Sequence, residues 1–172
     1  MTLHAREVLR DCERVLDHIT GDMRTELWRP RWAGLVALLR AVGHVLKKVD
    51  GKTSDAAREV IESAWKDLGQ SKPEPTIFWE FIEAERNNVV KAYEIGARVN
   101  ITVRPGAVWL NLATGETGSG PGGPTTFEAF MRSGPFQGRD PLELCREAIA
   151  FWQGYLDSID RQVAARHTGQ AV

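Results

Sequence analysis

The chain has 172 residues, and its 22 Lys and Arg against 23 Asp and Glu give a formal net charge of −1. Hydrophobic residues make up 42% and charged residues 26%, a composition typical of a globular protein and not of a disordered one. The length suits one domain with a sizeable core. Because the net charge is so small, the chain as a whole does not attract nucleic acid or a membrane, and such binding needs a local patch.

Two cysteines, Cys12 and Cys145, are too few for a disulfide scaffold and lack the spacing of metal ligands. Each lies in an apolar helical stripe, so we expect both to be small buried thiols. The N-terminus has no apolar signal segment, and the longest apolar stretch, Leu35 to Leu39, is far shorter than the roughly 20 residues that span a bilayer. We therefore expect a cytoplasmic protein that does not enter a membrane.

Helical periodicity dominates the first half of the chain, where apolar residues recur every three or four positions. Glycine, proline and hydroxyl-bearing residues separate the periodic stretches and serve as helix caps and stops. Four helices are predicted: one that ends at Gly21, then Pro30 to Val49, Thr53 to Leu68, and about Thr76 to Ile95.

After Ile95 the period of the apolar residues changes from 3.6 to 2, which is typical of strands. Two alternating runs flank Pro105-Gly106, so a β-hairpin is predicted over residues 98–113. The Gly- and Pro-rich tract 114–126 is predicted to be a flexible surface loop, because its glycine spacing does not match a phosphate-binding loop. We expect segment 127–139, which contains three phenylalanines, to cover the edge of the helices.

The last helix is predicted over residues 140–166, with Asp140 as its cap and Pro141 at its first position. Its apolar stripe alternates spacings of four and three, so it needs a partner helix within the bundle or across a dimer, and we expect a homodimer. The sequence thus predicts a single mainly α domain over residues 1–172. That domain is a bundle of about five helices with a small β-hairpin insertion before the last helix.

An arginine, Arg86, occupies the apolar face of the fourth predicted helix. Burying a guanidinium without partners is costly, so some group must meet its donors. Either a carboxylate or backbone carbonyls of a neighbouring helix hold it in the core, or it lines a pocket and binds a phosphate or carboxylate. On a helical wheel, the apolar residues within about 60° of Arg86 are Trp79, Ile82, Val89, Val90 and Tyr93.

Residues 85–94, with the sequence ERNNVVKAYE, resemble the R-N-x-x-x-H signature of HEPN-domain proteins. Those proteins are helical bundles, and many are metal-independent ribonucleases that dimerise to build one composite cleft. By this resemblance Arg86 and Asn87 match the family's arginine and the polar residue after it, whereas Lys91 stands where the family has histidine. The resemblance implies a catalytic or remnant site at these three residues. It also implies a context of phage defence, a toxin–antitoxin pair or a nucleotidyltransferase partner.

The lysine changes the chemistry of such a site. Histidine titrates near pH 6.5 and lysine near about 10.4, so Lys91 can stabilise charge on a phosphate but accepts a proton only if its pKa is strongly lowered. His44 is the best alternative base, although a helix-surface or satisfied core histidine is the more common case. No two histidines have metal-ligand spacing, so we expect no metal and no cofactor.

Six tryptophans are many for this length, and most are expected in the core. Trp28 and Trp32 lie among arginines at the start of a predicted helix, an arrangement that can stack bases and neutralise phosphates. A rim on the core or an interface anchor explains the same pattern, and we favour that interpretation. Tyr93, on the face of Arg86, is a third candidate for ligand binding.

Three functions are compatible with these residues. The preferred one is a HEPN-like protein that binds RNA, phosphate or a partner protein without catalysis at Arg86, Asn87 and Lys91. The second is an active metal-independent ribonuclease in which Lys91 or His44 replaces the missing base. The third is a structural homodimer in which Arg86 is a buried tie between helices.

Overall fold

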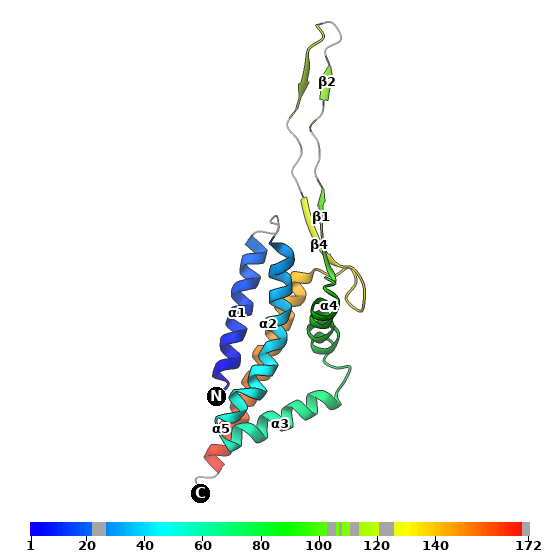
Figure 1. Cartoon of the computed structure of the whole chain (residues 1–172). Coiled ribbons are helices and arrows are strands. Elements are labelled where there is room, and N and C mark those ends of the chain that lie inside the picture. The colour runs from blue at the N-terminus through cyan, green and yellow to red at the C-terminus, as the bar shows by residue number, and fades with distance from the viewer. Residues whose placement is uncertain (22–26, 103–105, 107, 111–113, 121–125, 170–172) are drawn as a thin grey trace.

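The computed structural model describes residues 1–21, 27–102, 106, 108–110, 114–120 and 126–169 (Figure 1). The fold is mainly helical with a small antiparallel β element before the last helix, which confirms the predicted class. Within these residues the α-helices are α1 (Leu3–Gly21), α2 (Trp28–Lys48), α3 (Asp55–Gln70), α4 (Ala84–Ala92) and α5 (Pro141–Gly169). A short 3₁₀ turn, η1 (Asp50–Lys52), follows α2, and a π-helical segment, η2 (Ile77–Glu83), leads into α4.

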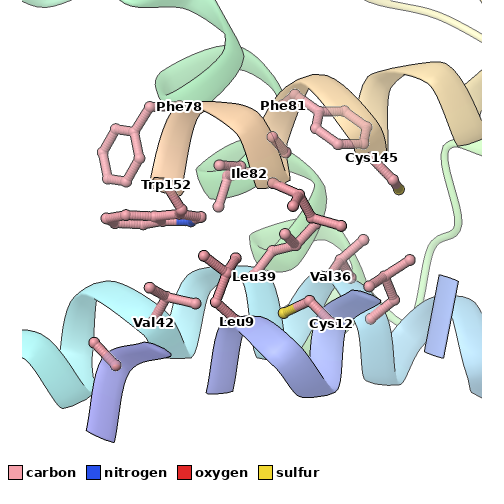
Figure 2. Close-up of a cluster of buried hydrophobic side chains, with 14 of the residues drawn as sticks. Leu9, Cys12, Val36, Leu39, Val42, Phe78, Phe81, Ile82, Cys145 and Trp152 are labelled. Atoms are coloured by element: carbon pink, nitrogen blue, oxygen red, sulfur yellow. The ribbon is translucent and has the colours of Figure 1, made fainter. Parts of the chain in front are cut away.

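The long helices α1, α2 and α5 run alongside one another, and α3 leaves the end of α2 at an angle and packs against α5 (Figure 1). The core lies between α1, α2, η2 and α5 (Figure 2). It includes Cys12 and Cys145, which are buried free thiols as predicted. Burial raises the pKa of the Cys12 thiol to about 12 and that of Cys145 well above its ordinary value, so both act as small apolar side chains.

The apolar stripe of α5 is covered within the chain itself. Its members are all buried against the other helices, so the stripe alone does not call for a second copy. Asp140 caps this helix as predicted, since its Oδ1 accepts a hydrogen bond of 2.7 Å from the backbone N of Leu142. The buried stripe comprises Cys145, Ile149, Trp152, Leu156, Ile159 and Val163.

In the described part of the chain no helix is long and apolar enough to cross a membrane.

Two carboxylates hold the start of α1 against the rest of the bundle. Asp50, which is 1% exposed, accepts hydrogen bonds from the backbone N of His4 (3.1 Å) and of Ala5 (2.9 Å), and His4 Nδ1 lies 2.9 Å from the same carboxylate. Asp160 of α5 accepts from the backbone N (2.8 Å) and Oγ1 (2.9 Å) of Thr2. These acceptors satisfy donors that the first turn of a helix leaves without partners.

The segment predicted as one helix from Thr76 to Ile95 consists of η2 and α4 and ends at Ala92. Tyr93 follows in the left-handed conformation, with φ of 52°, and so ends the helix before the predicted end at Ile95. The buried side chains on this segment are Phe78, Phe81, Ile82, Glu85 and Val89.

The buried face of this segment is therefore centred near Glu85, and the prediction of a buried face centred on Arg86 is wrong. Val90 and Tyr93, which the wheel placed in that face, are 57% and 59% exposed. A π-helical turn contains more residues than an α-turn, so a wheel of about 100° per residue does not hold across η2.

The β element is an arm built from two strand pairs. Strand β1 (Ala97–Thr102) pairs with β4 (Thr126–Met131), and β2 (Val108–Leu110) pairs with β3 (Thr117–Ser119), both antiparallel. The predicted hairpin over 98–113 is thus wrong in its pairing, because its two strands belong to different pairs. The tract 114–126 contains β3 and the start of β4, with Gly115 at a φ of +72° in the turn before β3. Pro105 of the predicted turn lies outside the described residues.

The base of the arm is fixed to the helices, which explains the observed pairing. Ala97 and Met131, the innermost pair of β1 and β4, are both buried. The backbone N of Arg132 donates to Gly96 O at 2.8 Å and extends the ladder by one step. In segment 127–139, Phe136 packs on the core, with its ring centroid 6.1 Å from that of Phe81. The arm projects away from the bundle from this base (Figure 1).

Candidate functional site

The three residues of the HEPN-like motif all lie on α4, but they do not form one cluster. Arg86 and Asn87 are half-buried, and Arg86 Nη1 donates a hydrogen bond of 3.0 Å to Asn87 Oδ1. Lys91 is exposed one turn further along the helix. Among the residues that the structure describes, neither Arg86 nor Lys91 forms an ion pair with a carboxylate. The positive charge of Arg86 is therefore available to an anion.

The buried polar residue of α4 is Glu85, which the sequence analysis did not single out. Glu85 is 4% exposed, and its Oε1 accepts hydrogen bonds from Trp32 Nε1 (2.9 Å) and from the backbone N of Gly96 (2.7 Å). This carboxylate ties α4 to α2 and to the start of the arm. A signal was present, because Glu85 follows Phe81 and Ile82 at the four- and three-residue spacings of a helical face.

The aromatic candidates occupy the neighbouring end of α2. Trp32 is fully buried and bonded to Glu85, so it belongs to the core and cannot stack on a base. Trp28 is half-buried with its ring centroid 5.4 Å from that of Trp32, as expected of a rim on the core. Tyr93 is exposed, and the guanidinium carbon of Arg29 lies 5.6 Å from its ring centroid. The structure thus brings Trp28, Trp32 and Tyr93 to one end of the α2–α4 contact.

His44, the alternative base, lies exposed on α2 within electrostatic range of Arg86. Partial burial lowers the pKa of His44, and the positive charges of Arg40, Arg86 and Lys48 lower it further, whereas Glu83 opposes them. His44 is therefore neutral at pH 7. Three cations and one carboxylate thus act electrostatically on this imidazole.

Glu83 only partly offsets these charges because Arg40 already pairs with it. Arg40 Nε lies 2.8 Å from Glu83 Oε2, and both side chains are largely buried, at 13% and 30% exposure. The Arg40 guanidinium also lies over the rings of Trp65 and Phe78, at 5.6 and 5.7 Å. Arg40 is thus held in place by the core.

We name the group of charged side chains around His44 and Arg86 the His44–Arg86 surface. It comprises Arg40, His44 and Lys48 of α2, Glu83 of η2, and Arg86 and Asn87 of α4. Its chemistry suits an anion with several oxygens, because a guanidinium with free donors and a nearby imidazole can both donate to it. Within the described ranges no group of three or more His, Cys, Asp or Glu side chains is placed to hold a metal ion.

The fold and this surface define a mainly helical protein with a projecting β arm and a local cationic surface. No protein-family model, curated protein or solved structure matches the chain. The HEPN resemblance therefore rests on residues 85–94 and stays a prediction.

Proposed function

We propose that this protein binds RNA through its phosphates at the His44–Arg86 surface and does not cut it. The observation that carries the proposal is the half-buried Arg86, whose charge no carboxylate within the described residues neutralises. Its neighbour Asn87 occupies one donor, Nη1, and leaves the others for a ligand. A guanidinium binds phosphate in a bidentate manner, which makes it the common choice at phosphate sites.

Binding without cleavage is supported by the surroundings of the two candidate bases. Lys91 is exposed and no interaction in the described part of the chain links it to His44. His44 accepts and donates no hydrogen bond there, so no partner fixes its tautomer and ring orientation as a general base requires.

One observation favours the ribonuclease as a second candidate function. The lowered pKa of His44 keeps its imidazole unprotonated at neutral pH, and Arg86 stands within electrostatic range. An unprotonated imidazole can take the proton of a 2′-hydroxyl while a guanidinium stabilises the phosphate.

RNA binding by Arg86→Ala tests the proposal. We expect wild-type protein to raise the fluorescence anisotropy of a labelled 20-nucleotide oligouridylate in EDTA, with an affinity that falls as salt rises. Arg86→Ala should weaken binding about tenfold, because a charged hydrogen-bond donor contributes about 1.5 kcal/mol. Lys66→Ala, which removes an exposed lysine of α3, is the matched control and should bind like wild type. The melting temperature of Arg86→Ala should stay within about 2 °C of wild type.

The same samples distinguish the two candidate functions. Failure of wild type to bind, or equal binding by Arg86→Ala, would contradict the proposal. RNA cleavage by wild type in EDTA that is lost in both Arg86→Ala and His44→Gln would establish the ribonuclease in its place.

A further inference from the structure

A cavity of about 120 Å³ lies where the β arm leaves the helices, and none of its lining residues belongs to the His44–Arg86 surface. It is enclosed by η2, by α4, and by the chain segment between β4 and α5. Its polar lining includes Glu80, Glu85, Asn88 and Ser133, and its walls include the rings of Phe81 and Phe136.

Glu85 brings a buried negative charge to this cavity. Both of its hydrogen bonds, from Trp32 Nε1 and Gly96 N, are accepted by Oε1. In the described part of the chain Oε2 accepts none, and no cation pairs with the carboxylate. Although Glu85 is only 4% exposed, it lines the cavity, where water or a ligand can donate to this oxygen. The cavity thus contains an oxygen acceptor without a donor.

The other charged residues around the cavity are also mostly negative. An adjoining cavity of about 70 Å³ shares Asn88, Gly96 and Ser133 with the first, and adds Glu94 and Arg132. Three carboxylates and one guanidinium therefore line the two cavities together. Negative charge remains for a ligand to neutralise.

We propose that this cavity binds a small organic cation, namely a guanidinium or a methylammonium-sized amine. Its N–H groups donate to Glu85 Oε2 and to the carboxylate of Glu80, while Phe81 and Phe136 form the aromatic wall. A cation already contacts this wall from within the chain, because the guanidinium carbon of Arg139 lies 5.7 Å from the Phe136 ring centroid. The size fits, since a cavity of about 150 Å³ accommodates benzene. The aromatic walls favour an organic cation over a metal ion, and among the described residues no three His, Cys, Asp or Glu side chains are placed close enough together to hold a metal. This inference does not depend on the proposed RNA binding.

Thermal melts and amide spectra with isosteric probes test the site. Methylguanidinium chloride at millimolar concentration should raise the melting temperature of wild type, whereas neutral methylurea, which has nearly the same shape, should not. Methylammonium chloride tests the amine head group, and sodium chloride controls for ionic strength. The backbone amide resonance of Gly96, which donates to Glu85, should shift with the cations alone.

Glu85→Gln is the decisive variant, because its amide oxygen can still accept from Trp32 and Gly96 while the charge is lost. We expect the cations to leave the melting temperature of Glu85→Gln unchanged, and to stabilise Glu62→Gln, an exposed control on α3, as they do wild type. If Glu85→Gln does not fold, Glu80→Gln should weaken the Gly96 shift at least several-fold. Equal stabilisation of Glu85→Gln, equal effects of methylurea, or no response of wild type to either cation would overturn the proposal.

Discussion

Glu85 and Arg86 are neighbours in the chain, yet they have different surroundings. The carboxylate is buried and binds Trp32, whereas the guanidinium is half-buried and bonds only to Asn87 within the described residues. Successive side chains of an α-helix point in directions about 100° apart. An error of this size in the predicted direction of the buried face therefore decides whether Glu85 or Arg86 is expected to be buried. The sequence was sufficient to single out this stretch of helix. It was not sufficient to decide which of the two charges is buried.

The bond between Trp32 and Glu85 should contribute measurably to stability. Trp32→Phe removes the indole donor, so the free energy of unfolding should fall by about 2 kcal/mol from the lost bond to a buried charge and the lost ring volume. Trp28→Phe is the matched control one turn earlier, where the ring is half-buried and makes no hydrogen bond in the described structure, and should cost less than about 1 kcal/mol. Urea unfolding measures both, and equal losses would contradict this role of Trp32.

At the scale of elements, periodicity predicted α1, α2, α3 and α5 because each has a buried apolar face, whereas the π-helical η2 shifted the buried face of the fourth predicted helix. The strands could not be paired in the same way. Alternation located β1 and β2, but their partners depend on burial of Ala97 and Met131 at the base of the arm, which no local pattern reveals. The turn chosen from the sequence, Pro105-Gly106, was the strongest local signal, whereas β1 pairs with β4, which is much further along the chain, and β2 pairs with β3 across a later turn.

The cap that Asp50 places on α1 joins two elements far apart in the chain. Asp50→Ala should lower the free energy of unfolding by about 2 kcal/mol, because it leaves the backbone N–H groups of His4 and Ala5 without acceptors. Hydrogen exchange at Ala5 should accelerate more than exchange in the middle of α5. Asp11→Ala removes an exposed carboxylate paired with Arg14 on the same helix and should cost no more than about 0.5 kcal/mol. An undiminished stability in Asp50→Ala would show that the cap is dispensable.

At the scale of the whole molecule, the helices and the outer part of the arm are separate structural units. The helices share one hydrophobic core, to which the arm contributes at its base through Ala97 and Met131. The outer pair, β2 with β3, packs on no helix in the described structure (Figure 1). A two-stranded pair has little stability of its own, so the bundle should not depend on it.

Shortening the arm tests whether the helices fold without the outer strand pair. Replacing residues 103–125 with Asn-Gly joins Thr102 directly to Thr126, its partner in the register, through a two-residue hairpin turn. The melting temperature should stay within about 4 °C of wild type, which corresponds to about 1 kcal/mol for a chain of this size. Circular dichroism measures the transition. A large loss of helix signal would show that the bundle needs the outer arm.

The central claim is that RNA phosphates bind beside Arg86 and His44. The most direct test is to measure the pKa of the His44 imidazole by NMR, with and without oligouridylate. In the free protein this pKa lies below the ordinary value of about 6.5, because burial and the nearby cations disfavour the charged form. A bound phosphate favours the charged form, so the pKa should rise on binding. By linkage the affinity for RNA should then increase as the pH falls from about 7 towards 5. A His44 pKa that is unchanged at saturating RNA would place the RNA elsewhere and contradict the claim.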